Sequence, residues 1–382
     1  MENNVAANAD VVEEANVAEA ALPQKKQRKP INQQKLQDNL WGWIFCVPLI
    51  IGTVWFVYIC LVAALLLSFT DYSVYNTSGL SMFEYLAEMG LHPAKNPDTG
   101  AVDALGWYKY AFTHTVDAGG GYMMNELGIH LFNTVFYMIG IPIGMILAMF
   151  FAVCMTRDIP GANVFRVLYY FPSVASTVSI VYTFKLMFSN GGVMNQLLGL
   201  TDFRGQGFTW LSIGTGLESL TWNGPTGQSV MNAFMNSSYW CQGIITKCII
   251  IIMSVWKGLG GTVILYIAGL SGVNAATKEA AQIDGANGWQ IFWKVTMPDL
   301  YPTIFYNIVT AVIGGMQIYM EPELLTANAP FTSGYVWLIY YYGISGTDNP
   351  APSWGAAYGM ILAVMIMVLT LFQFWLDSKN KD

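Results

Sequence analysis

Six long apolar segments constrain the fold of this chain more than any other feature. Each meets or nearly meets the ~20 residues that an α-helix needs to cross a bilayer core of ~30 Å. Lipid offers the backbone no hydrogen-bond partners, so a single segment of this kind must cross as a helix. The sequence therefore predicts an all-α polytopic membrane protein with six transmembrane helices, at residues 41–67, 129–155, 164–188, 244–270, 301–320 and 354–375.

Composition supports a membrane protein and offers no catalytic apparatus. Of 382 residues, 54% are hydrophobic and 11% are charged, against about a quarter charged in soluble domains. The spans hold no paired carboxylates, no G-x-x-x-x-G-K-[ST] occurs, and His92, His114 and His130 lack ligand spacing. Five cysteines mostly lie in apolar segments without C-x-x-C spacing, although a Cys241–Cys248 link stays open. We expect neither an enzyme nor a nucleic-acid-binding protein, and no metal or cofactor bound by this chain.

The first 40 residues differ from the rest of the chain. They begin acidic and turn basic around Lys25 and Arg28, with no periodic apolar face. This pattern predicts a disordered cytoplasmic tail with a basic anchor. A signal peptide is the alternative, but residues 41–67 far exceed the ~7–15 apolar residues of a signal peptide, so we expect an uncleaved first span.

The loops decide the orientation of the spans. Lys and Arg gather in the tail, the turn at 156–163, the loop at 271–300 and the C-terminus. Because cytoplasmic loops carry the excess of basic residues, both termini and the 271–300 loop are predicted to be cytoplasmic. Two long segments, 69–128 and 189–243, then lie outside and are expected to fold as caps or docking surfaces.

The loop at 271–300 is the only long polar interruption in its region, and its pattern is helical. Asn274 can cap a short helix, and Gly285 can end it in a left-handed conformation. Aromatic residues at i, i+3 and i+4 from Trp289 then give a second short helix one apolar face. Pro298, which lacks an N–H, closes that helix and suits the first turn of the next one. The sequence predicts a helix–glycine–helix hairpin on the cytoplasmic membrane surface.

The loop contains a spaced set of residues: Glu279, Ala280, Ala281, Asp284, Gly285, Ala286, Val295, Met297 and Pro298. With this set, the hairpin resembles the EAA loop found in permease subunits of binding-protein-dependent ABC importers. The spacing matches throughout, with Val295 and Met297 departing mildly from the Ile and Leu of the family. The flanking stretches resemble the carbohydrate, maltose-permease-like branch, and the likeness covers residues 164–320 well.

The resemblance implies a type I ABC importer permease fold in a bacterial cytoplasmic membrane. The chain would comprise the tail (1–40), a first span with its exterior segment (41–128) and a permease core (129–382). Implied partners are a homologous second permease, two ATPase subunits that carry the ATP and Mg, an extracellular sugar-binding protein and membrane lipid. The implied cargo is a carbohydrate, preferably an oligosaccharide, moved by alternating access.

The hairpin residues suit a contact that transmits motion from an ATPase. Ala280 and Ala281 permit close docking, while Glu279 and Asp284 offer charge partners. Gly285 makes the sharp exit from the helix. A merely solvated loop is the alternative, and it fits the charges but not the tryptophans and alanines.

Lys257 is the most informative charge within the spans. It lies roughly 13 residues, or ~20 Å at 1.5 Å per residue, from either end of its span. Snorkelling cannot cover that distance, so it should face the interior or an aqueous cavity. With the ring of Trp256 before it and Gly258 after it, the site suits a sugar. Pairing with a polar group on another helix is an equally supported alternative.

Polar residues in other spans are further candidates for the substrate pathway. Asn307 and Gln317 in the fifth span either line a pathway or bond helix to helix, and Tyr182 is a weaker candidate. An ion-coupled secondary transporter is the alternative function. Such carriers place Asp or Glu inside their spans, and the six spans predicted here contain neither.

Overall fold

The structure is a computed structural model. The first 32 residues of the predicted tail and most of the predicted exterior segments lie outside the described residues. The chain divides into two compact units, residues 1–61 and 62–382. The described residues are 33–73, 84, 93–95, 100–117, 123–156, 162–189, 191–199, 210–211, 243–326, 331–345 and 351–379.

The described part of the first unit, residues 33–61, is one continuous helix, which ends at Leu67 in the second unit. Helix α2 (Gln33–Thr53) passes through a π-helical segment, η1 (Val54–Ile59), into α3 (Cys60–Leu67). Residues 41–67 are apolar enough to span a membrane. The helix begins inside the segment predicted to be disordered, because Gln, Lys and Leu before Trp41 are good helix formers that extend the apolar helix.

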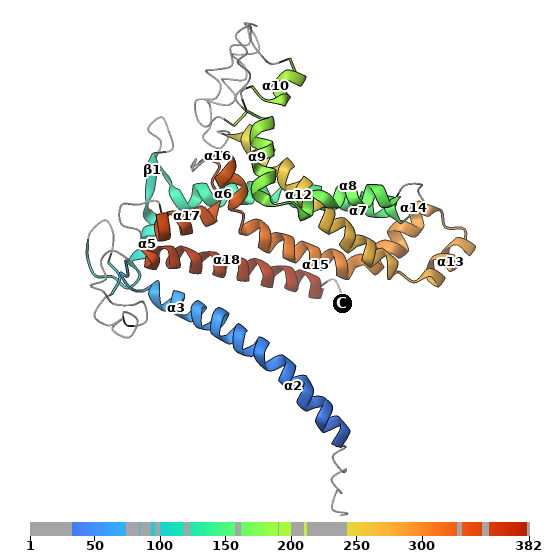
Figure 1. The fold of residues 1–382 in the computed structure, drawn as a ribbon, viewed down its shortest axis with the longest axis horizontal. Coiled ribbons are helices and arrows are strands. Elements are labelled where there is room, and N and C mark those ends of the chain that lie inside the picture. Colours follow the sequence, from blue (N-terminus) through green and yellow to red (C-terminus); the bar gives the residue numbers. More distant parts are fainter. Residues whose placement is uncertain are drawn as a thin grey trace, which may run out of the picture. The chain divides into compact units, whose positions relative to one another are not determined.

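The second unit is predominantly helical, with one small antiparallel sheet (Figure 1). Its further elements, in chain order, are α5 (Gly106–Thr113), β1 (Thr115–Asp117), β2 (Met123–Asn125), α6 (Glu126–Met138), α7 (Gly140–Met155), α8 (Ala162–Val174), α9 (Thr177–Met187), α10 (Val193–Leu197), α12 (Ile244–Ser271), α13 (Ala275–Ile283), α14 (Gly288–Ile291), η4 (Phe292–Thr296), α15 (Met297–Met316), α16 (Met320–Thr326), α17 (Tyr335–Tyr340), η5 (Tyr341–Ser345) and α18 (Pro352–Lys379).

Helix α12 forms the centre of this unit and packs against α7, α8 and α15. Ile250 and Met253 on α12 are fully buried. Gly260 lets α8 approach closely, since a Cβ there would lie 2.6 Å from the backbone oxygen of Tyr169. Burial of apolar side chains between these helices fixes the scaffold around which the polar residues are arranged.

Three predicted spans coincide with long helical stretches of the second unit. These stretches run over Glu126–Met155, where the single turn residue Ile139 separates α6 from α7, Ile244–Ser271 and Pro352–Lys379. They extend one to six residues in all beyond their apolar segments. Turns of a helix can continue into flanking residues that bond within the helix, so hydropathy defines the middle of a span better than its ends.

The third predicted span, 164–188, is not one straight helix. The structure breaks it between α8 and α9, whose axes differ by 97°. Ser176 at the break is extended, with φ −59° and ψ 132°. Pro172, four residues earlier within α8, has no N–H to donate to the carbonyl one turn back, which weakens the helix shortly before the break.

The fifth span also differs from its prediction of 301–320. A continuous helix runs from Gly288 to Met316, then bends by 40° into α16. Pro298 lies in the first turn of α15, as predicted, but it does not close the preceding helix, which runs on without a break. The preceding π-helical turn, η4, ends with Met297 N–H bonded to Phe292 O. This wider turn accommodates a residue without a donor.

Polar side chains along α6 hold the segment that joins α16 to α17. Thr134 Oγ1 accepts from the Tyr335 N–H at 2.8 Å, and Asn133 Nδ2 donates to Ser333 O at 3.0 Å. Tyr137 Oη donates to Thr332 O. These buried bonds fix the described residues before α17. The hydroxyls of Thr326 and Thr332 bond to each other at 2.8 Å, so this segment is also joined to α16, which packs against α9 and α12.

The described part of segment 69–128 folds as a small cap. Strands β1 and β2 pair antiparallel, with Val116 opposite Met124. Trp107 donates its indole N–H to Thr70 O at 2.7 Å and stacks on Trp354 at the start of α18, with ring centroids 5.2 Å apart. The cap is therefore bonded to the helical core.

Candidate functional site

The hairpin of 271–300 begins with a capped helix. The Asn274 side chain accepts from the Ala276 N–H at 2.9 Å, and α13 follows. The N–H of Ala286 bonds to Ala281 O, and that of Gly285 bonds to Gln282 O, both at 3.0 Å. This pair of bonds is a Schellman motif, with Gly285 at φ +79°. The cap and the glycine stop therefore lie where the sequence predicts them.

The face of this hairpin is open. No residue of α13 is buried. Glu279, Ala280 and Asp284 are exposed, and Ala281 and Ala286 are half-buried. Ile283 and Trp289 expose 87% and 71% of their surface. Apolar side chains exposed between charged ones are typical of a protein contact surface.

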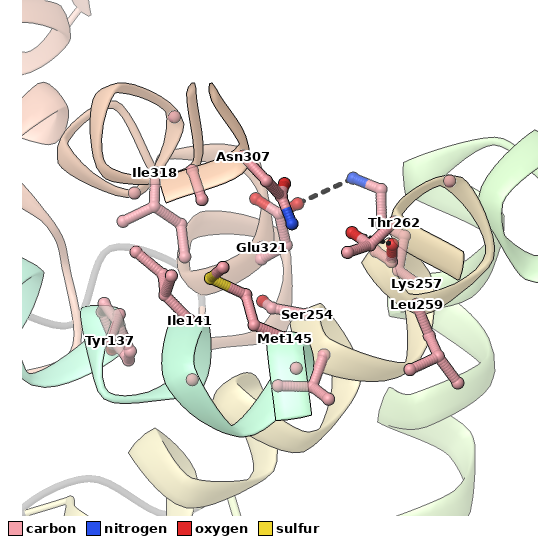
Figure 2. A pocket seen from close by; sticks show the side chains of 18 of the residues that line it. Tyr137, Ile141, Met145, Ser254, Lys257, Leu259, Thr262, Asn307, Ile318 and Glu321 are labelled. Carbon is pink, nitrogen blue, oxygen red and sulfur yellow. Dashed lines mark hydrogen bonds and ion pairs between the residues drawn. The ribbon is translucent and has the colours of Figure 1, made fainter. Parts of the chain in front are cut away.

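A second candidate site is a cavity of about 630 Å³ between α6, α7, α8, α12, α15 and α16. Four of the predicted pathway residues line it: Lys257, Gly258, Asn307 and Gln317. Figure 2 shows the Lys257 side chain extending from α12 toward Glu321 on α16. Its Nζ lies 2.8 Å from Oε1 of Glu321.

The remaining polar groups of the cavity are partly engaged. Asn307 donates its amide to the Tyr266 hydroxyl at 3.0 Å, so it bonds α15 to α12 while lining the cavity. The Thr262 and Ser173 hydroxyls bond to backbone carbonyls within their own helices. The Ser254 hydroxyl is buried without a hydrogen-bond partner among the described residues.

The two aromatic candidates lie elsewhere. Trp256 and Tyr182 are not among the described residues that line the cavity. Trp256 is 44% exposed and packs on Phe184, with ring centroids 5.8 Å apart. Tyr182 is 52% exposed, and Lys185 lies over its ring. Their predicted role in the pathway stays a prediction.

Comparison with known families places this geometry in context. Residues 140–382 match the family described as "Binding-protein-dependent transport system inner membrane component". The chain belongs to this family. The predicted resemblance is thereby confirmed, and the chain is a permease subunit of a transport system, not an enzyme.

The permease is similar to several proteins along most of its length. It is 25% identical over 354 residues to the probable ABC transporter permease protein YesP of Bacillus subtilis (strain 168), covering 91% of this chain and 94% of that protein. It is 28% identical over 253 residues to the lactose transport system permease protein LacF of Rhizobium radiobacter, covering 65% and 75%.

The fold of the permease is also found in a solved structure. A bacterial alginate ABC transporter, in complex with an alginate pentasaccharide-bound periplasmic protein, contains a chain with a TM-score of 0.58 at 18% identity. The match covers 90% of this chain and 95% of that chain. At this identity the likeness shows the fold, a type I ABC importer permease fold, as predicted.

Sequence reasoning missed two residues of the permease. Glu321 lies one residue after the predicted end of the fifth span, so the six predicted spans contain no carboxylate. The structure corrects this, because α16, the second part of the bent fifth span, contains Glu321. Ile283 is an isolated apolar residue among the polar ones of the loop. Carboxylates at a span end, Glu321 and Glu323, opposite a mid-span Lys257 are the signal that could have found the pair.

Proposed function

We propose that this permease is one of two membrane subunits of an ATP-driven importer of carbohydrates. The observation that carries the proposal is the α13 helix, of which no residue is buried, with its glycine stop, next to a membrane-spanning core. Names of similar proteins support the cargo, since one is a lactose transport permease and another chain comes from an alginate transporter. An oligosaccharide is the preferred cargo, in line with the pentasaccharide of that complex.

In this proposal, α13 docks into a cleft of a partner ATPase. Ala280 and Ala281 allow close approach, and the exposed Ile283 supplies an apolar contact that removes surface from water. Glu279 and Asp284 offer charges that orient the two partners. Because the helix is capped at both ends, it moves as a rigid body when the ATPase moves. ATP and Mg bind to the ATPase subunits.

Cargo passes through the cavity that holds Lys257 and Asn307. A homologous second permease completes the pathway, and a binding protein delivers the carbohydrate on the side opposite α13. The host membrane is the bacterial cytoplasmic membrane, with both termini and α13 facing the cytoplasm. The spans alternate between states open to each side as the ATPases close and open.

The deciding experiment is purification of the tagged permease from its host, followed by reconstitution into liposomes. We expect a second polytopic subunit and an ATPase to be recovered with it, and uptake of a radiolabelled oligosaccharide to require ATP and the binding protein. Uptake driven by an ion gradient without ATP or an ATPase would overturn the proposal.

A charge reversal tests the role of α13. Glu279→Lys should abolish recovery of the ATPase while leaving the second membrane subunit in the complex. Asp103→Lys is the matched control, because it makes the same change in the cap outside the core. Equal ATPase recovery for both variants would remove α13 from the docking surface.

A further inference from the structure

The ion pair between Lys257 and Glu321 sets the charge of the cavity. The side chains are 27% and 15% exposed, so both are reachable from the cavity. They are the only charged residues among the described residues that line it. The described lining therefore carries no net charge, yet it presents a strong donor beside a strong acceptor.

This pairing suits neighbouring hydroxyl groups. A Lys ammonium has three N–H donors and a carboxylate has about four acceptor sites, so their mutual bond leaves most of both free. Gly258 and Gly261 leave open space, since no atom lies within 4 Å of where a Cβ would stand on either. A sugar ring could lie over this bare backbone and bond to both charged groups.

The same pairing opposes an anion. A carboxylate that approached Lys257 would also approach Glu321, and like charges repel strongly where water is scarce. Drawing Lys257 away from Glu321 would leave a charge in the cavity without its partner. A neutral sugar meets neither penalty.

We propose that the cavity accepts neutral carbohydrates and that Glu321 is the residue that excludes acidic ones. This inference rests on the proposed function, in which the cavity is part of the sugar pathway. The fold alone does not fix the charge of the cargo, because a solved chain of this fold belongs to an alginate transporter. Glu321 acts by neutralising Lys257, which would otherwise attract a uronic acid.

The test uses probes that differ only in charge. Trisaccharides of galacturonic and glucuronic acid are compared with their methyl esters for binding to the purified transporter complex, without the binding protein, by calorimetry. We expect the wild-type complex to bind at least one ester about tenfold or more tightly than its acid, because only the acid meets like-charge repulsion. Equal or tighter binding of the acid overturns the proposal, and so does failure of every ester to bind.

Two variants separate charge from structure. Glu321→Gln removes the negative charge that neutralises Lys257. The variant should therefore lower the ester-to-acid preference about tenfold or invert it. The exchange of Lys257→Glu with Glu321→Lys keeps the cavity neutral and should keep the preference for the ester. Either variant is used only after its complex elutes with all subunits. A Glu321→Gln complex with the wild-type preference overturns the role of Glu321.

The outcome for the importer itself is read separately. ATP-dependent uptake and recovery of the ATPase do not depend on the charge of the probe. A complex that imports an oligosaccharide with ATP yet fails the ester-to-acid comparison keeps its proposed function and loses the assignment of Glu321. A complex with neither uptake nor ATPase fails at the earlier step.

Discussion

Asn307 on α15 donates its side-chain amide to the hydroxyl of Tyr266 on α12 at 3.0 Å, beside the cavity. Tyr266 is 1% exposed and Asn307 is 8% exposed, so water cannot readily replace this bond. This polar contact therefore joins α12 and α15, which both line the cavity. Asn307 accordingly has both of the roles between which its sequence position could not decide, lining the cavity and bonding helix to helix.

Removing the hydroxyl tests this contact. Tyr266→Phe leaves the Asn307 amide buried with one bond fewer, which should cost about 1–3 kcal/mol. We expect a lower Tm of the purified complex by differential scanning fluorimetry. Tyr306→Phe is the control, because Tyr306 lies one residue before Asn307 and is 59% exposed. Equal Tm values for the two variants would show that the bond contributes nothing.

The close approach of α8 to α12 predicts a sharp difference between two adjacent glycines. A Cβ on Gly260 would lie 2.6 Å from Tyr169 O and 2.9 Å from Tyr170 Cα, both backbone atoms. Gly260→Ala should therefore destabilise the complex by about 1–3 kcal/mol through overpacking.

Gly261→Ala provides the comparison, because nothing lies within 4 Å of its Cβ position. It should be neutral or slightly stabilising, since Ala favours a helix over Gly by up to ~1 kcal/mol. Thermal unfolding of the two complexes, followed by fluorescence, checks the order. A Gly261 variant as unstable as the Gly260 variant would contradict the packing of α8 on α12.

Local features of this fold could be predicted from the sequence, and distant ones could not. The Asn274 cap and the Gly285 stop depend on neighbours within a few residues, so the chemistry of each residue suffices to place them. The Lys257–Glu321 pair joins residues 64 positions apart. The position of Lys257 implied a partner, but nothing in the sequence indicated which one.

Bends were missed for a related reason. Hydropathy measures how apolar a segment is and contains no information on its direction, so α8 and α9 looked like one span despite a 97° angle. Pro172 was available as a signal, but Pro302 lies inside α15 without breaking it. A proline alone therefore does not decide between a tolerated kink and a break.

The bonds from α6 to the α16–α17 segment predict a second stability effect. Thr134→Val keeps the shape of the side chain and removes the acceptor of the Tyr335 N–H. That N–H is buried, so its loss of a partner should cost about 1–3 kcal/mol. Thr183→Val is the control, because the Thr183 hydroxyl is exposed and donates to Ser179 O in its own helix.

The readout for Thr134 is amide hydrogen exchange in the assembled complex. We expect faster exchange at residues 331–335 in the Thr134 variant and no change in the Thr183 variant. Because α16 is joined to this segment, exchange near Glu321 should rise as well. Unchanged exchange in both variants would mean that α6 does not hold the segment between α16 and α17.

The left-handed backbone of Gly285 predicts a coupling defect without loss of the membrane fold. Its φ of +79° is a conformation that costs an L-residue roughly 1–2 kcal/mol. Gly285→Ala should therefore distort the turn after α13 and lower both ATPase recovery and ATP-driven uptake several-fold. The spans lie apart from this turn, so the yield of membrane-inserted protein should not change.

Gly288→Ala separates the conformational effect from the added methyl group. Gly288 lies in the same loop, has nothing within 4 Å of its Cβ position and has no left-handed φ. It should retain wild-type ATPase recovery. If the two alanines impaired recovery equally, bulk in the loop and not the φ angle of Gly285 would be responsible. If neither did, the sharp exit from α13 would play no part in docking the ATPase.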